Sequence, residues 1–407
     1  MSYVGIEALR GKLARKKPRI QRRYDYYEMK YKARDLGIST PPELRALNST
    51  LGWCATAVDS LADRLIFREF ENDNFGINGI YAQNNPDIIF DSAIKSALIA
   101  SCAFVYISRN AEGLPRLQVI DGAHATGIID PITYLLTEGY AVLAADDYGK
   151  PITEAYFTAE ETVVIDNDVM TTYPNPTGYP LLVPVINRPD AKRPFGHSRI
   201  SRAAMGVVDE ASRTIKRSEI AAEFYSFPQK YVTGLSQDAE GIDKWKATMS
   251  ALMTFTKDDD GDKPSLGQFS QQSMAPHVEQ LRMFASLFAG EMGLTLDDLG
   301  FPAENPSSSE AIKAAHEGLR LTATKAQRTF GVGFLNAGFV AACLRDNYHY
   351  LRNQLYLTQP VWQPVFAPDA SALSVIGDGI IKINNAVPNF FDGAAIHNLT
   401  GIKGNEK

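Results

Sequence analysis

The sequence predicts an α+β fold built from several packed units, and three features of its 407 residues predict it. Long stretches with helical apolar spacing and clear start signals alternate with a middle region, about 103–187, of short β-branched and aromatic runs. The length exceeds that of a typical single core, so two or three packed units are expected. Apolar residues make up 45% and charged residues 22%, the composition of an ordinary folded protein.

The first clear helix signal is Thr40-Pro-Pro-Glu43, in which a hydroxyl cap, prolines in the first turn and a Glu three residues on form a capping box. A second helix is expected to begin at Asn48 or Ser49, because apolar residues recur there at helical spacing. A third is predicted from Pro86 to about Ser101, leading into the β-like run Ala103–Ile107.

The N-terminal segment is strongly basic. Residues 1–37 hold eleven Lys or Arg against four carboxylates, a net +7, which leaves −13 for the rest of a chain whose total is −6. Tyrosines are interleaved with these cations at Arg22–Lys32, so a nucleic-acid contact is one interpretation, with Lys and Arg on phosphates and aromatic rings on bases. The simpler alternative is a solvated surface helix.

A β-rich subdomain is predicted next. Its runs include Leu117–Ile120, Ala155–Phe157 and Val163–Ile165. Asp147-Tyr-Gly-Lys150 and Asp166-Asn-Asp168 stand where hairpin turns are expected, since their side chains tolerate the backbone angles of tight turns. The acidic residues of these turns therefore need no catalytic role.

After Pro194 the pattern is helical to about Ser226, and Pro228 marks the end. A second amphipathic helix is expected from Pro276 to about Met292. The two helices bracket an insert, residues 229–272, and are expected to lie antiparallel. The insert should hold strands at Lys230–Thr233 and Leu252–Thr256, a short helix near Trp245 and an acidic loop at Lys257–Lys263.

A long helix is predicted from Ser307 to about Leu355, with a kink at Gly331-Val-Gly333 because glycine weakens a helix interior by about 1 kcal/mol. Beyond it we expect a short helical stretch near Ser371–Ala386 and a weakly specified tail after Gly401.

Neither the cysteines nor the longest apolar stretches point to export or to a membrane. Cys54, Cys102 and Cys343 are far apart and form no Cys-x-x-Cys pair, so buried thiols in a reducing cytoplasm are expected. The basic N-terminus lacks the apolar core of a secretory signal. No apolar stretch approaches the ~18–20 residues that span a bilayer.

No catalytic or cofactor motif passes a test of spacing. Gly11-Lys12 and Gly149-Lys150 lack the remainder of a phosphate-binding loop, and His316-Glu317 lacks the second histidine of a zinc protease. Gly331–Gly333 lacks the third glycine of a dinucleotide site, and Asp258–Gly261 lacks the final Glu of a calcium loop. An enzyme, a cofactor and a metal are therefore not predicted.

Several segments, in this order and spacing, resemble the portal or head–tail connector proteins of tailed bacteriophages, in particular the siphophage branch. These segments are Trp53, Ala57–Arg64, Pro184–Pro189, Arg193–Ile200, Ala222–Tyr231, Leu299-Gly300 and Glu304–Ile312. The resemblance spans most of the chain.

The resemblance implies a portal fold with a helical and β-rich wing, a two-helix stem, a small α/β clip, a long wing helix and a short helical crown. A large crown is not expected, since little follows Gly401. The implied boundaries are 1–196 for the wing, 197–228 and 273–293 for the stem helices, 229–272 for the clip, 294–308 for a tunnel loop, 309–358 for the long wing helix and 359–407 for the crown or C-terminal segment.

The resemblance also implies a homo-oligomeric ring, usually dodecameric, that is assembled in the host cytoplasm and sits at the capsid portal vertex of the virion. Double-stranded DNA would pass through its channel without sequence specificity, during packaging and again during ejection. The implied protein partners are the terminase large subunit, then the head–tail adaptor, together with the major capsid and scaffold proteins.

Three groups of residues become candidate sites under this interpretation. An acidic or small lining suits a low-friction channel, because repeated cations would hold the DNA phosphates. The clip loop would meet a protein partner, although a solvated turn is the usual role of such a charge run. The candidates are Asp297, Asp298, Glu304, Asn305, Ser307 and Ser308 in the tunnel loop, Arg282 in the stem, and Lys257, Asp258, Asp259, Asp260, Asp262 and Lys263 in the clip.

Two other interpretations remain. Another self-assembling virion protein, a capsid or adaptor subunit, would also lack catalytic motifs, but the order of long helix, insert and long helix argues against it. A nuclease with scattered carboxylates is the enzymatic alternative, and hydrolysis assays with added divalent metal would reveal it.

Overall fold

The computed structural model describes residues 3–33, 49–226, 230–233, 265–268, 273–302, 309–366, 370–400 and 402. The chain forms two compact units of mixed α and β structure, which confirms the α+β prediction. The first unit comprises Met1–Tyr31, Gly52–Ala204 and Met292–Lys407, and the second comprises Lys32–Leu51 and Met205–Glu291.

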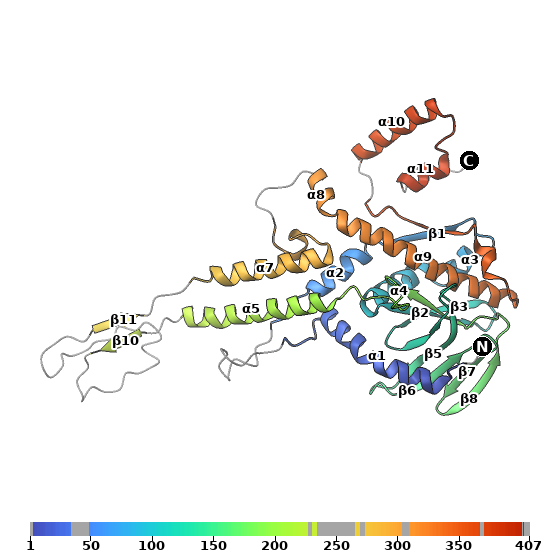
Figure 1. The fold of residues 1–407 in the computed structure, drawn as a ribbon, viewed down its shortest axis with the longest axis horizontal. Coiled ribbons are helices and arrows are strands. Elements are labelled where there is room, and N and C mark those ends of the chain that lie inside the picture. The colour runs from blue at the N-terminus through green and yellow to red at the C-terminus, as the bar shows by residue number, and fades with distance from the viewer. Residues whose placement is uncertain are drawn as a thin grey trace. The chain divides into compact units, whose positions relative to one another are not determined.

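The described residues of the first unit form three antiparallel sheets (Figure 1). A three-stranded sheet has the order β3-β2-β9, with β2 at Cys102–Arg109, β3 at Pro115–Asp121 and β9 at Leu182–Ile186. A five-stranded meander runs through β4 (Ala125–Ile129), β5 (Leu136–Ala145), β6 (Pro151–Phe157), β7 (Glu161–Asp166) and β8 (Val169–Pro174). The third sheet pairs β1 (Phe67–Glu71) with β12 (Gln359–Trp362). The predicted β-rich subdomain is thus confirmed.

The predicted hairpin turns are present between β5 and β6 and between β7 and β8. In the first, the Asp146 carboxylate accepts hydrogen bonds from the backbone N–H of Tyr148 and of Lys150. In the second, Asn167 and Asp168 have φ angles of 46° and 65°. Asn and Asp tolerate this left-handed region better than other side chains, and it matches the strand twist of a tight hairpin.

Two helices pack against the three-stranded sheet. Helix α4 (Pro86–Ala100) contacts β2 and β3, and α9 (Glu317–Asp346) contacts β9. Their aromatic rings meet, with the Phe90 and Phe334 centroids 4.7 Å apart. Helices α2 (Trp53–Ala62) and α3 (Ile77–Ala82) complete this core by packing on α4 and α9 respectively. The helix predicted from Pro86 and the strand that follows it are both confirmed.

Helix α9 is not interrupted at Gly331–Gly333, where the glycines suggested a weak point, because it runs as one helix through both glycines. A Cβ at Gly331 would lie 2.6 Å from the Pro360 side chain, and one at Gly333 would lie 3.1 Å from the Val185 backbone. The glycines therefore allow close packing. The interruption falls earlier, at His316, between α8 (Ser309–Ala315) and α9. Helix α9 also ends at Asp346 instead of near Leu355, since Asn347 adopts the left-handed conformation that closes a helix.

Helix α1 (Ile6–Tyr27) is the largest element that the sequence analysis did not place as such. It lies against the five-stranded sheet, where Leu9 and Leu13 are buried with Tyr140 of β5. It is therefore a packed helix and not only a solvated one. The helix expected at Thr40–Glu43 lies outside the described residues.

The second unit contains all but the first turn of α5 (Arg202–Ser226), α7 (Ala275–Met292) except its last residue, and the antiparallel pair β10 (Lys230–Thr233) and β11 (Ser265–Gln268). Helix α5 begins at Arg202 and not directly after Pro194, because residues 195–201 form a loop and the Ser201 hydroxyl accepts the Ala204 N–H. The strand at Lys230–Thr233 is confirmed. Trp245, the strand predicted at Leu252–Thr256 and the loop Lys257–Lys263 lie outside the described residues.

The C-terminal part contains η2 (Asp297–Leu299), η3 (Arg352–Leu355), α10 (Ala370–Ala386) and α11 (Gly393–Thr400). Helix α10 confirms the stretch predicted at Ser371–Ala386. The Asn384 side chain joins it to the next segment, since it donates to the Phe391 carbonyl and accepts the Phe391 N–H.

Candidate functional site: the helix pair, the turn after it and the polar anchors

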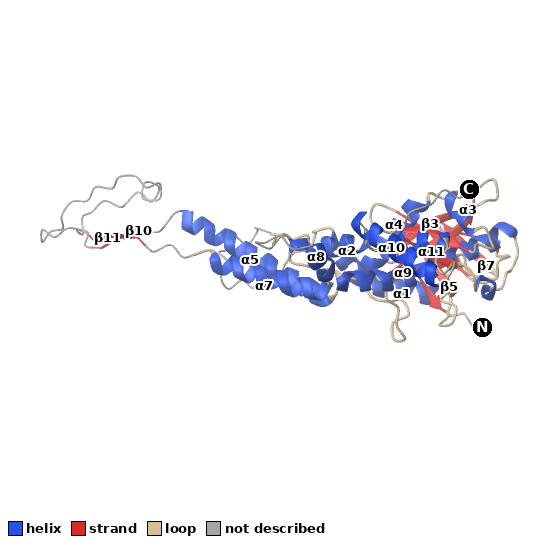
Figure 2. Ribbon diagram, turned by 90° about the horizontal axis from the view of Figure 1, so that it is seen from above, coloured by secondary structure: helices blue, strands red, loops and turns tan. Residues whose placement is uncertain are grey.

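Helices α5 and α7 run side by side and antiparallel in the second unit (Figures 1 and 2). Small side chains are buried along each helix, including Val208 and Ala211 on α5 and Ala285 on α7. The Thr214 hydroxyl of α5 lies 3.2 Å from the side-chain oxygen of Gln280 on α7. The predicted antiparallel arrangement of the two helices is thereby confirmed.

The opposite face of α7 is apolar and exposed. Met283 and Leu287, one turn apart, are 50% and 55% exposed, whereas Ala285 and Phe288 on the other face are fully buried. A helix face that contacts only water does not need two exposed apolar side chains on successive turns. Arg282, the predicted channel residue, lies beside this stripe and is exposed.

The turn that follows α7 holds two of the predicted tunnel-loop residues. Asp297 is exposed, but Asp298 is half-buried and its carboxylate accepts hydrogen bonds from the N–H (2.8 Å) and the hydroxyl (2.9 Å) of Thr295. Since the Thr295 hydroxyl also accepts the Asp298 N–H, the pair forms a reciprocal capping box for η2. Asp298 therefore has a local structural role, which the spacing Thr-x-x-Asp could have revealed.

The remaining predicted site residues have no described geometry. They are Glu304, Asn305, Ser307 and Ser308 of the tunnel loop, and Lys257, Asp258, Asp259, Asp260, Asp262 and Lys263 of the clip.

A buried arginine that the sequence analysis did not single out joins three segments of the first unit. The Arg199 guanidinium donates to the Ala57 carbonyl in α2 at 2.6 Å and to the Met292 carbonyl at the end of α7 at 2.8 Å. Burial, with a further contribution from the charge of Arg188, lowers the pKa of Arg199 to about 10. The residue thus remains a cation at neutral pH and fixes the backbone next to both long helices.

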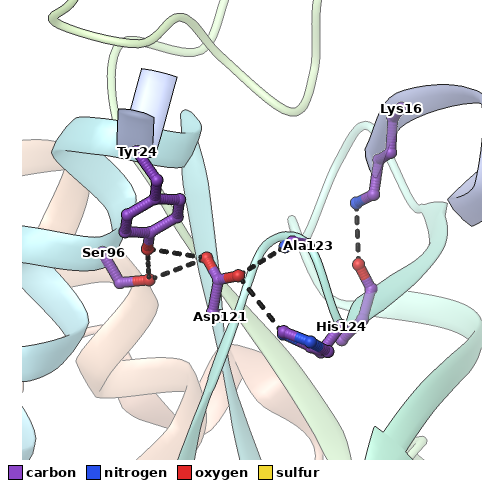
Figure 3. Close-up of polar contacts among 7 residues, drawn as sticks. Lys16, Tyr24, Ser96, Asp121, Ala123 and His124 are labelled. Atoms are coloured by element: carbon purple, nitrogen blue, oxygen red, sulfur yellow. Dashed lines mark hydrogen bonds and ion pairs between the residues drawn. The ribbon is translucent and has the colours of Figure 1, made fainter. Parts of the chain in front are cut away.

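Figure 3 shows a second polar group, half-buried and centred on Asp121 at the end of β3. The carboxylate accepts hydrogen bonds from Tyr24 of α1 (2.8 Å), Ser96 of α4 (3.2 Å) and the Ala123 N–H (2.9 Å), and it lies 3.4 Å from the His124 ring. Burial raises the pKa of Asp121, but these donors outweigh it and hold the pKa below its usual range.

The Asp121 group contains Ser, His and Asp, yet its order excludes a hydrolase triad. In such a triad the histidine lies between serine and aspartate and takes the serine proton. Here Asp121 lies between Ser96 and His124, so the serine hydroxyl contacts the carboxylate and not the histidine. The group therefore anchors α1 to α4 and β3.

The inner face of α1 is held by further polar contacts. Glu138, which is 2% exposed, accepts hydrogen bonds from the N–H of Val4 (2.9 Å) and Gly5 (3.1 Å), where a helix N-terminus favours negative charge. Lys12 and Lys16 each donate at 2.7 Å, to the carbonyls of Gly127 and Ala125. Lys12 and Lys16 therefore hold α1 against β4.

The part of the chain with described coordinates contains no cluster of His, Cys, Asp and Glu suited to a metal ion. Its three cysteines are buried and unpaired, as predicted. None of its helices is both long and apolar enough to cross a membrane.

Comparison with known proteins identifies relatives along most of the chain. The portal protein of Mycobacterium phage D29 is 25% identical over 398 residues, which cover 89% of this chain and 80% of that protein. The portal protein of Mycobacterium phage L5 is 24% identical over 393 residues, with the same coverage.

Among solved structures, the neck of a native gene transfer agent particle computed with C12 symmetry is similar, with a TM-score of 0.49 and 14% identity, covering 93% of this chain and 98% of that one. The virion of the native gene transfer agent particle gives a TM-score of 0.49 and 13% identity, covering 94% and 99%.

The family model described as phage portal protein, SPP1 Gp6-like, matches residues 6–343. This range includes α1, all of the β-rich region, both long helices of the second unit and nearly all of α9. The chain therefore belongs to the SPP1 Gp6-like family of phage portal proteins, which are structural virion proteins and not enzymes.

Proposed function

We propose that this portal protein forms a closed ring, dodecameric as in the C12 neck named above, around a channel through which double-stranded DNA is packaged and ejected. The observation that carries the proposal is the match of residues 6–343 to the portal family. Cyclic rings need surfaces that meet different surfaces on the next subunit. The exposed stripe of Met283 and Leu287 opposite the buried face of α7 is suited to such a contact.

We assign the parts of the ring as follows. Residues 1–196 and 309–358 form the wing, 197–228 and 273–293 the stem, 229–272 the clip, 294–308 the tunnel loop, and 359–407 the crown or C-terminal segment. The antiparallel pair α5 and α7, with the insert between them, supports the stem and clip assignment.

In this ring, Arg282 and the tunnel-loop residues would face the DNA. Asp297 and Asp298 would repel phosphates, and Asp298 would also keep its turn rigid through Thr295. The acidic clip loop, residues 257–263, would contact the terminase large subunit during packaging and the head–tail adaptor afterwards. The wing would contact the major capsid and scaffold proteins.

Cysteine labelling of assembled rings tests the channel assignment, because the three native cysteines are buried and give little background. Arg282→Cys is compared with Tyr148→Cys, which replaces a side chain that is 97% exposed in the turn after β5. Both variants should react fully with a small maleimide.

A long polyethylene glycol maleimide separates the two positions. We expect it to modify every subunit at position 148 but only a few per ring at position 282, since bulky chains crowd a narrow channel. Complete modification at both positions would show that Arg282 does not face a channel.

A further inference from the structure

The outer face of α1 carries a stripe of exposed arginines. Arg15, Arg19 and Arg22 are spaced i, i+4 and i+7, so they share one face of the helix and span about 10 Å along its axis. This face points away from the one that holds Leu9 and Leu13 in the core. The stripe is thus separate from the cations that anchor the helix.

Two more arginines extend the stripe from other parts of the first unit. The loop before α5 lies on α1, because the Phe195 ring is 4.9 Å from the Lys12 ammonium and 5.6 Å from that of Lys16. Arg193 precedes this ring by two residues, and Arg202 begins α5. Both are exposed. Burial, together with the charges of Arg19, Arg193 and Arg202, lowers the pKa of Arg23.

The carboxylates around the stripe are engaged elsewhere. Asp25 accepts a hydrogen bond from Gln21, Asp190 pairs with His197 at 2.5 Å, and Glu28 pairs with Lys30 at 2.5 Å. Among the described residues, no carboxylate lies within ion-pair distance of Arg15, Arg19 or Arg22. Repulsion between neighbouring guanidinium groups is therefore left without local compensation.

The chemistry of this face favours nucleic acid over a protein partner. A protein interface has an apolar or aromatic centre, but the helix exposes no large apolar side chain between Arg15 and Arg22. Guanidinium groups bind phosphate oxygens with two parallel hydrogen bonds. Contacts of this kind to the backbone position a protein on DNA without reading its sequence.

The tyrosines of α1 indicate whether the arginine stripe suits double-stranded or single-stranded nucleic acid. Tyr24 donates to Asp121, Tyr27 donates to Asp59, and Tyr26 stacks on Tyr31 with ring centroids 4.5 Å apart. Proteins that hold single strands stack bases on exposed aromatic rings. Since each of these tyrosines is engaged within the fold and none is exposed, the stripe offers phosphate contacts only, which suits a duplex.

We propose that Arg15, Arg19 and Arg22, extended by Arg193 and Arg202, form a surface that binds the phosphate backbone of double-stranded DNA without sequence specificity. Phosphate binding by this surface would require neither a ring nor a channel, so it can be tested independently of the proposed function.

The test uses the full chain and a short fluorescein-labelled duplex of random sequence, with binding followed by fluorescence anisotropy over a series of NaCl concentrations. The variant is Arg15→Gln/Arg19→Gln/Arg22→Gln. The matched control, Arg116→Gln/Lys150→Gln/Lys382→Gln, removes three exposed cations elsewhere. The slope of log affinity against log salt should fall by about 0.9 for each lost phosphate contact, about 2.7 in the variant. The control should keep nearly the wild-type slope.

Three results would overturn the proposal: equal slopes for variant and control, no duplex binding by the wild type at low salt, or a single strand of the same length bound as tightly as the duplex. Light scattering on the same samples covers the protein alternative. If the variant loses self-association while its DNA affinity equals that of the control, the stripe is a subunit contact instead. Thermal melts by circular dichroism confirm that both variants are folded.

Discussion

The Arg199 guanidinium donates a hydrogen bond to the Met292 carbonyl at 2.8 Å, which joins the segment before α5 to the last residue of α7. The chain between these residues includes both long helices of the second unit. The same guanidinium also holds Ala57 in α2. One side chain, 7% exposed, thereby ties the segment before α5 to α2 and to the last residue of α7.

Replacement of Arg199 should lower the free energy of unfolding. Arg199→Met retains much of the volume but removes the guanidinium hydrogen bonds to two buried carbonyls, and each such loss costs about 1–3 kcal/mol. We expect the free energy of unfolding to fall by about 2–4 kcal/mol, with a smaller loss for Arg199→Lys. Urea unfolding at one protein concentration measures it. Arg328→Met, at an exposed site on α9, serves as the control. Equal stability of Arg199→Met and this control would contradict the account.

Two glycines of α9 should respond in opposite directions to the same substitution. A Cβ at Gly338 would lie 2.2 Å from the Ile77 side chain of α3, whereas one at Gly318 would meet nothing within 4 Å. Gly338→Ala should therefore destabilise by about 1–3 kcal/mol through overpacking. Gly318→Ala should be neutral or stabilise by up to about 1 kcal/mol, because alanine favours helix. Thermal melting of both variants decides the matter, and a stable Gly338→Ala would disprove the close helix contact.

The Asp121 group predicts a dependence of stability on pH. Its donors lower the folded-state pKa below the unfolded value of about 3.9, so the unfolded state binds more protons in acid. The stabilisation is present above that value and is lost as the pH falls through the folded-state pKa. Wild-type protein should thus lose this component below about pH 4.

Asp121→Asn isolates the contribution of Asp121. This variant should melt lower than wild type at neutral pH, and the difference should narrow as the medium becomes more acidic than pH 4. Melting temperatures of the two proteins over a pH series measure the gap. A gap that stays constant down to pH 3 would show that the carboxylate charge is not what stabilises the site.

Glu138 should control the start of α1. Glu138→Gln keeps the shape but loses one acceptor, so one of the N–H groups of Val4 and Gly5 or the Tyr156 hydroxyl is left unpaired. We expect a loss of about 1–3 kcal/mol and faster amide exchange at the beginning of α1. Hydrogen exchange read by mass spectrometry tests this. The exposed substitution Glu112→Gln is the control, and unchanged exchange in Glu138→Gln would refute the capping role.

Elements with strong local signals were predictable. Pro at the first turn and helical spacing identified the helix from Pro86, and the turn residues Asn167 and Asp168 identified a hairpin. Elements whose stabilising partners lie far away in the sequence were not predictable. Helix α1 was left as a solvated or nucleic-acid-binding segment because its inner-face lysines, Lys12 and Lys16, find their carbonyl partners on a strand more than a hundred residues away.

The site was predictable to a similar degree. Short segments such as Glu304–Ile312 were enough to suggest the family, and the antiparallel helix pair followed from the two amphipathic stretches. The role of Asp298 could be predicted from Thr295, three residues earlier. The role of Arg199 could not, since its acceptors Ala57 and Met292 come from separate parts of the sequence. The arginine stripe of α1 became meaningful only once its tyrosines were seen to be engaged.

The central claim is that this chain assembles into a closed ring. Light-scattering mass after size exclusion, with negative-stain images of the same peak, tests it most directly on protein free of nucleic acid. The account predicts particles with a central hole and a mass of about 540 kDa, twelve times the 44.8 kDa of one chain. A stable 44.8 kDa monomer at high concentration, with no rings in the images, would contradict it.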